Sequence, residues 1–146
     1  MTEIPDDLNA RNVDALVRLR KEMAGPPFHA LLQPIAISAD AEAGSVCVRL
    51  PFKAELARAP GDAAFHGGVI AALIDMTGHA AVAVKTGRMA PTIDLRIDYL
   101  RPSDGSDVIA TARLIRLGRT ISRVDIEVHD DAGRLIALGR GSFSSV

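Results

Sequence analysis

The chain has 146 residues, enough for one domain with a full hydrophobic core. Its formal net charge is −1 and only 3% of its residues are aromatic, which argues against binding to nucleic acid or to an anionic membrane. The single cysteine, Cys47, excludes an internal disulfide and is typical of a reducing compartment. Residues 1–7 are acidic and lack the apolar core of a signal peptide. We therefore expect a soluble cytoplasmic protein that binds neither nucleic acid nor membrane.

The N-terminal half alternates between helical and extended patterns. Apolar residues at helical spacing predict a helix over residues 9–24, which the following Gly-Pro-Pro ends. Strands are expected at residues 32–38 and 45–52. Residues 53–65 form a Pro- and Gly-containing loop that leads into a long apolar helix over residues 67–84. Apolar residues lie on every face of that helix, which is typical of a helix buried on all sides.

After the long helix the period of the apolar residues changes from 3.6 to 2. Strands are expected at residues 93–99, 108–117, 120–129 and 135–144, separated by turns rich in Gly, Asp and Pro. The order of elements is α-β-β-α-β-β-β-β. Hairpins with helices to one side predict an α+β fold, in which the long helix packs against an antiparallel sheet. We expect a single domain, with residues 32–146 as its core.

Asp75 lies in the middle of the long apolar helix and is its only carboxylate. A buried carboxylate is costly to desolvate unless it is paired, protonated or used in a reaction. Together with His79 it argues against insertion of this helix into a membrane. The alternative is a structural acid satisfied by backbone or Thr partners. Asp75 is therefore the first candidate for a catalytic role.

The long helix opens with His66-Gly67-Gly68. The two glycines can permit a tight turn from loop to helix, or they can let a ligand approach bare N–H groups at the positive end of the helix dipole. Both interpretations can hold together. His66 at the helix start is expected to orient the loop. The sequence thus predicts an oxyanion site at this helix N-terminus.

The motif continues beyond the helix start. Besides the His-Gly-Gly and the acid nine positions after its His, the matching residues are Leu73, Pro91-Thr92, Tyr99-Leu100-Arg101-Pro102, Gly118-Arg119 and residues 137–143. From about residue 44 onward, these residues and the order of elements resemble the hotdog fold, in which a curved antiparallel sheet wraps a long helix. More narrowly, the chain resembles the acyl-CoA thioesterases of the phenylacetic-acid-degradation (PaaI) type.

This resemblance implies hydrolysis of coenzyme A thioesters without a cofactor. It implies that Asp75 is the general base or nucleophile, that the Gly67 N–H holds the thioester oxygen and that Thr92 helps to orient water. His66 is the fourth residue expected at this catalytic site. Some members of the family carry Asn or Gln six residues before the His, where this chain has Pro60. Because proline cannot donate a hydrogen bond, Gly67 would carry more of the carbonyl polarisation.

Four further residues are expected to contact the substrate: Gly68, His79, Arg101 and Arg119. His79 lies one helical turn after Asp75, where it can tune the carboxylate or simply pack. Arg101 and Arg119 stand at strand ends and can bind coenzyme A phosphates, or they can belong to a solvated charged face. No metal site is expected, because the two helix histidines are thirteen positions apart, which separates them by roughly 20 Å.

Gly67 and Asp75 are eight residues apart on one helix, about 12 Å along its axis. A single thioester carbonyl cannot use both from one chain. We therefore expect a homodimer or a dimer of dimers, with the sites at the subunit interface. Two other functions stay open: a hydratase or dehydratase on the same fold, and a non-catalytic acyl-CoA-binding module.

Overall fold

The computed structural model describes residues 6–146, with side chains from residue 10 on; residues 1–5, part of the segment in which no signal peptide is expected, lie outside the described residues. The helices are α1 (Asp6–Ala24), α2 (Pro27–Leu32) and α3 (Gly67–Thr86), with a 3₁₀ turn at Ala54–Leu56. The strands are β1 (Ile35–Asp40), β2 (Ser45–Leu50), β3 (Thr92–Tyr99), β4 (Val108–Arg116), β5 (Ile121–Asp130) and β6 (Leu135–Ser144). The fold is the expected α+β arrangement.

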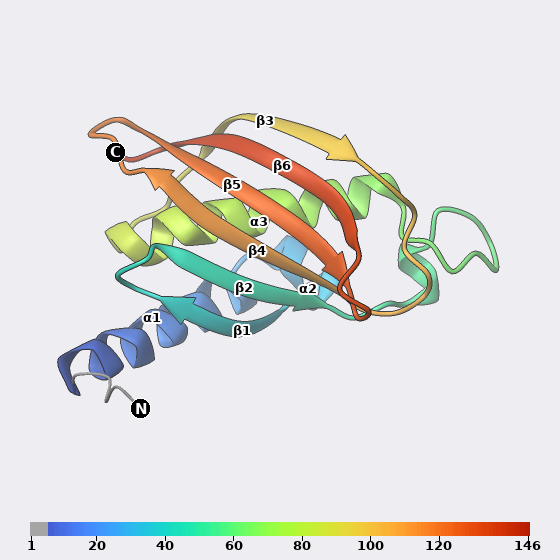
Figure 1. The fold of residues 1–146 in the computed structure, drawn as a ribbon, viewed down its shortest axis with the longest axis horizontal. Helices are drawn as coiled ribbons and strands as arrows, with labels where there is room; N and C mark the ends of the chain where they lie inside the picture. The colour runs from blue at the N-terminus through green and yellow to red at the C-terminus, as the bar shows by residue number, and fades with distance from the viewer. Residues whose placement is uncertain (1–5) are drawn as a thin grey trace.

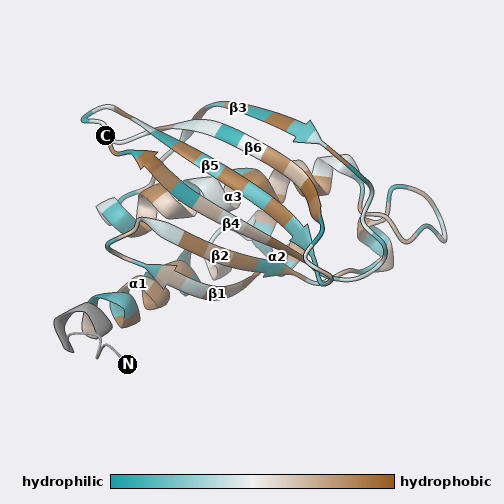
Figure 2. Cartoon of the chain, viewed as in Figure 1, coloured by the Kyte–Doolittle hydropathy of each residue, from teal (hydrophilic) through white to brown (hydrophobic). Residues whose placement is uncertain are grey.

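All six strands form one antiparallel sheet in the order β1-β2-β4-β5-β6-β3. The sheet crosses in front of α3 in Figure 1, and α1 lies beside β1 and α3. Along β5, Val124, Ile126 and Val128 are buried, while Arg123 and Glu127 face outward. Figure 2 shows the same alternation of apolar and polar residues along the strand. The predicted period of 2 is therefore confirmed for β5.

Glycines let α3 approach the sheet closely. A methyl group on Gly139 of β6 would collide with Ile74 of α3. One on Gly78 of α3 would collide with Phe143 of β6. The helix therefore sits deep against the sheet, and its covered side forms the centre of the core.

The strand expected at residues 32–38 is wrong in its first half. The chain instead forms the short helix α2, and β1 begins only at Ile35. The Gly-Pro-Pro run ends α1 at Ala24, and its last residue, Pro27, occupies the first position of α2, where the restricted φ of proline is favourable. Gln33 then adopts a left-handed conformation, with φ 58°, and closes α2. The apolar residues before β1 thus belong to a helical turn.

β3 is less covered than its alternating pattern predicts. It forms one edge of the sheet and pairs only with β6. Leu95 and Ile97 are half-buried, whereas Ile93 is 53% and Tyr99 is 55% exposed. The expected apolar row is therefore open at both ends, because an edge strand has no second neighbour to shield it.

α3 is not buried on all sides within one chain, so that expectation is wrong for the single chain. Gly67 and Gly68 are exposed, and Ala71, Asp75 and His79 are half-buried along the same stripe. The sheet covers one side of α3 and α1 covers another, which leaves this stripe open among the described residues. By length and composition α3 could span a membrane, but 61% of its apolar stretch is buried inside the protein, as in a core helix.

Candidate active site

The N-terminus of α3 presents an unused N–H group. The His66 imidazole caps the helix, with Nδ1 accepting a 2.8 Å hydrogen bond from the Gly68 N–H. The His66 carbonyl accepts from the N–H groups of Val69 and Ile70, at 2.9 and 3.3 Å. These bonds polarise the His66–Gly67 peptide group, whose N–H belongs to Gly67. That N–H has no acceptor among residues 6–146, and it lies at the positive end of the helix dipole.

Tyr99 at the end of β3 closes one side of this helix start. Its hydroxyl donates a 2.7 Å hydrogen bond to the Gly67 carbonyl. The sequence pattern placed Tyr99 on the apolar face of a strand and missed this role. The signal that could have found it is a polar-tipped aromatic residue at a strand end, where one end of the ring stays in water.

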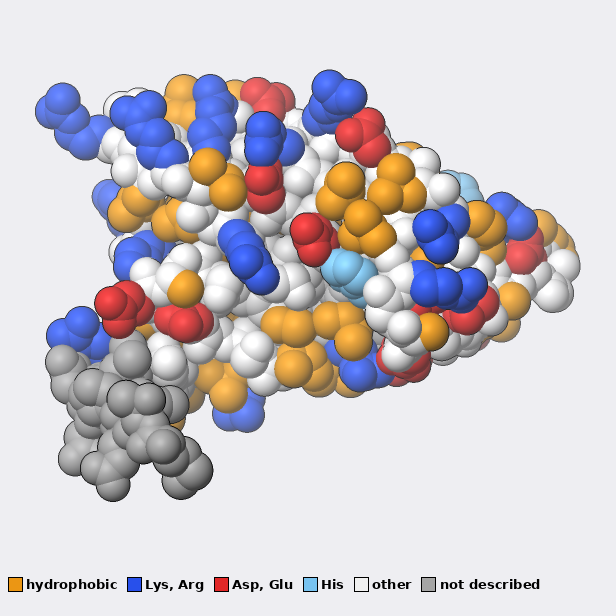
Figure 3. All heavy atoms as spheres, in the orientation of Figure 1, with side chains coloured by type: hydrophobic (Ala, Val, Ile, Leu, Met, Phe, Trp, Pro, Cys, Tyr) orange, Lys and Arg blue, Asp and Glu red, His pale blue; other side chains and the backbone are white. Residues whose placement is uncertain are grey.

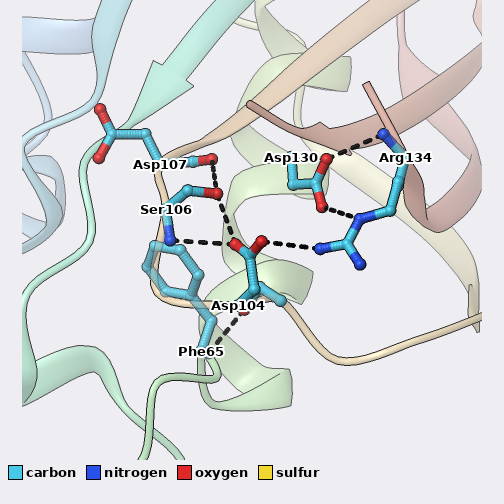
Figure 4. Close-up of polar contacts among 7 residues, drawn as sticks. Phe65, Asp104, Ser106, Asp107, Asp130 and Arg134 are labelled. Carbon is cyan, nitrogen blue, oxygen red and sulfur yellow. Dashed lines mark hydrogen bonds and ion pairs between the residues drawn. The ribbon is translucent and has the colours of Figure 1, made fainter. Parts of the chain in front are cut away.

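A buried hydrogen bond ties the loop before α3 to the loop after β3. The Phe65 N–H donates to the Ser103 hydroxyl at 2.9 Å, and both residues are buried. The loop after β3 is held in turn by Arg134, whose guanidinium reaches Asp104 and Asp130, at 2.7 Å each (Figure 4). The β5–β6 hairpin thus fixes the loop on which the helix start rests.

The two carboxylates of this network are kept ionised. Burial on its own would raise the pKa of Asp130, but hydrogen bonds from the N–H and guanidinium of Arg134 outweigh it and lower the pKa below its ordinary value. The pKa of Asp104 is lowered mainly by hydrogen bonds from the hydroxyl and N–H of Ser106, with a contribution from the Arg134 charge. Both carboxylates therefore accept hydrogen bonds at neutral pH.

Asp75 lies on the open stripe of α3, against the start of β3. The Thr92 hydroxyl donates a 2.6 Å hydrogen bond to Asp75 Oδ1. No other hydrogen bond reaches this carboxylate among the described residues, so Oδ2 keeps its lone pairs for a proton or an electrophile. Thr92 is thus placed to orient the carboxylate, where the resemblance implied a role in orienting water.

His79 is engaged by the protein. Its Nε2 accepts a 3.2 Å hydrogen bond from the Ala90 N–H, and Nδ1 lies 3.6 Å from Glu22 Oε2 of α1. Burial lowers the pKa of His79, although the nearby Glu22 and Asp75 charges oppose that shift. No hydrogen bond joins His79 to Asp75. The expected contact with substrate therefore competes with two partners inside the chain.

The two arginines expected to contact substrate lie at opposite ends of the sheet. Arg101 stands with Arg58 at the rim of a pocket beside Gly67, whose base is lined by Phe65, Ile70 and Ile136. Arg119 lies in the β4–β5 turn at the opposite end of the sheet, near the C-terminal end of α3. Lys and Arg side chains gather over that end in Figure 3, and Arg116 and Arg123 line the hollow next to Arg119. One chain therefore brings only Arg101 to the helix start.

The charged residues elsewhere on the sheet pair partly with one another. Arg140 forms a two-pronged ion pair with Asp125, and Arg123 donates to Ser142. Pro60, with the exposed Gly61 at φ 74°, lies in the exposed turn that the 2.6 Å Arg58–Asp62 ion pair closes. No group of three or more His, Cys, Asp or Glu side chains that could hold a metal ion occurs within the described part of the chain.

Comparisons with known proteins agree with this architecture. Residues 63–137 match the thioesterase superfamily. A predicted esterase of Halobacterium salinarum is 37% identical over 79% of this chain and 83% of its own length. The medium/long-chain acyl-CoA thioesterase YigI of Escherichia coli is 33% identical over 53% of this chain and 60% of its own length. The solved structure of the PaaI protein of E. coli superposes with a TM-score of 0.81 at 24% identity, over 92% of this chain and 95% of that one.

The matched segment includes the start of α3, Asp75, β3 and the loop that Ser103 anchors. The solved neighbour shares the long helix and the sheet along nearly its whole length. The chain therefore belongs to the thioesterase superfamily and is a thioester hydrolase, and it shares the hotdog fold of the PaaI protein.

Proposed function

We propose that the protein hydrolyses an acyl-CoA thioester to a free acid and coenzyme A. The observation that carries the proposal is the unpaired, polarised N–H of Gly67 at the start of α3. As a nucleophile attacks the thioester carbon, negative charge develops on the carbonyl oxygen, and a fixed N–H at a helix terminus stabilises it. The acyl-CoA thioesterase among the relatives supports coenzyme A as the leaving group.

Asp75 supplies the base or the nucleophile. As a base, its free Oδ2 takes a proton from water while the water oxygen bonds to the carbonyl carbon; the C–S bond then breaks and the coenzyme A thiolate leaves. As a nucleophile, the carboxylate itself displaces the thiolate, and water hydrolyses the resulting anhydride. In both cases the Thr92 hydroxyl holds the carboxylate in place through Oδ1.

A second copy of the chain completes the site. Gly67 and Asp75 are separated by about 12 Å along α3, so one carbonyl cannot reach both within a chain. Both residues lie on the open stripe of α3, and both are hydrogen-bonded to the edge strand β3. A two-fold partner with its α3 antiparallel would bring its Asp75 beside this Gly67, and would do so twice. The same operation moves the Arg119 end of one copy toward the Arg101 end of the other.

We also propose that residues 1–146 act as one domain in the cytoplasm. The pocket beside Gly67 combines an apolar base of Phe65, Ile70 and Ile136 with the basic rim of Arg58 and Arg101. That combination fits an apolar acyl or pantetheine segment that is joined to phosphates.

A panel of coenzyme A thioesters tests the function. The panel would run from acetyl-CoA to palmitoyl-CoA and include phenylacetyl-CoA and an enoyl-CoA, with release of free thiol as the readout. We expect thiol release that Asp75→Asn lowers by at least about a hundredfold, the range for loss of a catalytic acid or base. Binding without thiol release would indicate the non-catalytic module, and loss of the enoyl absorbance without thiol release would indicate a hydratase.

A further inference from the structure

A continuous chain of hydrogen bonds runs from β3 through the start of α3 to His66. The Tyr99 hydroxyl donates to the Gly67 carbonyl at 2.7 Å. That carbonyl and the Gly68 N–H belong to the same peptide group. The Gly68 N–H in turn donates to His66 Nδ1 at 2.8 Å. Hydrogen bonds that share a peptide group polarise each other, so the bond from Tyr99 strengthens the bond that holds the imidazole.

The direction of this chain fixes the proton on His66. Because the backbone N–H can only donate, Nδ1 must accept and therefore carries no proton. A neutral imidazole then has its proton on Nε2, on the opposite side of the ring. His66 is exposed, so the Nε2–H group is available for a ligand at the start of α3.

The space around the two glycines matches this arrangement. A Cβ on Gly68 would lie 3.0 Å from His66 Nδ1 and 3.2 Å from Cε1, so a side chain there would push the ring away. A Cβ on Gly67 would lie 3.6 Å from the Tyr99 ring, which is ordinary contact. Gly68 is thus needed for the position of the His66 ring, and Tyr99 lies close against the Gly67 side of the same peptide.

We propose that Tyr99 is a positioning residue that acts on His66 through the Gly67–Gly68 peptide group. Its hydroxyl holds that peptide so that His66 keeps one ring orientation and the Nε2–H tautomer. His66 Nε2–H then serves as a second donor to the thioester oxygen beside the Gly67 N–H. The catalytic part rests on the proposed thioesterase function, whereas the tautomer of His66 is a property of the free protein.

The first test is the ¹⁵N NMR spectrum of the His66 ring, which distinguishes the two neutral tautomers without any substrate. In the wild-type protein we expect one Nε2–H tautomer. In Tyr99→Phe, which keeps the ring and loses only the hydroxyl, we expect a mixture of tautomers or broadened ring signals. A wild-type Nδ1–H tautomer would overturn the proposal, as would an unchanged His66 spectrum in a folded Tyr99→Phe protein.

The second test is kinetic. Loss of one hydrogen bond predicts that Tyr99→Phe lowers kcat by about 3- to 10-fold with little change in KM. In a His66→Ala background the same change should have almost no effect, because Tyr99 acts through the ring. Equal effects in both backgrounds would contradict the proposal. Thr111→Val, which removes a hydroxyl on the outer face of β4, is the matched control and should keep wild-type kinetics.

The two tests separate the two ways of failing. A locked His66 tautomer that Tyr99→Phe releases, in a protein that hydrolyses no thioester, would refute the proposed function and leave the hydrogen-bond chain intact. Normal thioesterase activity, together with a His66 spectrum that Tyr99→Phe leaves unchanged, would refute only the role of Tyr99.

Discussion

At the α3 N-terminus, the neighbouring glycines Gly67 and Gly68 differ in what a side chain would meet. A Cβ on Gly68 meets the His66 ring, whereas a Cβ on Gly67 makes only ordinary contact with Tyr99. Neither glycine has a positive φ, so both backbones accept alanine. The sequence motif treats the two as one Gly-Gly unit, but the structure gives them separate tasks: Gly67 offers an N–H, and Gly68 leaves room for the ring that caps the helix.

This difference predicts how Gly67→Ala behaves. The variant should fold with unchanged or slightly higher thermal stability, because its methyl group fits and alanine favours helix. The same methyl group stands beside the N–H that the thioester oxygen would use, so kcat/KM should fall by at least about tenfold. Gly68→Ala should also lose activity, but it alone should change the NMR signals of His66. A folded Gly67→Ala protein with wild-type kinetics would remove Gly67 from the oxyanion site.

At the scale of elements, the regular parts of the fold were predictable and the joints between them were not. The buried row of β5 follows from alternation alone, because both neighbours of that strand are in place. α2 was missed because a proline that ends one helix can start the next. The Tyr99–Gly67 and Ser103–Phe65 bonds join positions 32 and 38 residues apart, so no local pattern could reveal them. The site residues carried by the sequence motif, Gly67 and Asp75, needed no such pairing to be named.

The Asp130–Arg134–Asp104 network predicts a pH-dependent stability. The Asp130 side chain is fully buried, and its pKa lies below the ordinary value of about 3.9. A lowered folded-state pKa stabilises the protein above that ordinary value, and the stabilisation is lost as pH falls through the folded-state pKa. Asp130→Asn should therefore be less stable than wild type at pH 7, and the difference from wild type should shrink below about pH 4.

Urea unfolding at neutral and acid pH measures this effect. Asp131→Asn is the matched control, because Asp131 is the neighbouring acid and its ion pair with Arg49 is half exposed. Its cost should stay below about 1 kcal/mol at pH 7. Equal costs for the two variants, or a difference from wild type that grows in acid, would show that Asp130 does not anchor the hairpin as described.

At the scale of the whole molecule, three features of the single chain point to a missing partner. The stripe of α3 that carries Gly67 and Asp75 is open, β3 has a free edge, and the basic β4–β5 turn lies far from the pocket at the helix start. One two-fold partner with an antiparallel α3 would address all three. A closed two-fold interface of this kind creates two identical sites, each with Gly67 from one copy and Asp75 from the other.

Mixing two inactive variants tests this arrangement. Asp75→Asn keeps a sound Gly67, and Gly67→Val keeps a sound Asp75, so each heterodimer would contain one intact site and one site with both defects. Random exchange in an equal mixture makes half of the dimers mixed, and activity should return to about a quarter of the wild-type value. Native mass spectrometry would establish that subunits exchange. If exchange is complete and no activity returns, or if the active enzyme sediments as a monomer, the two residues do not act across an interface and the site must be built within one chain.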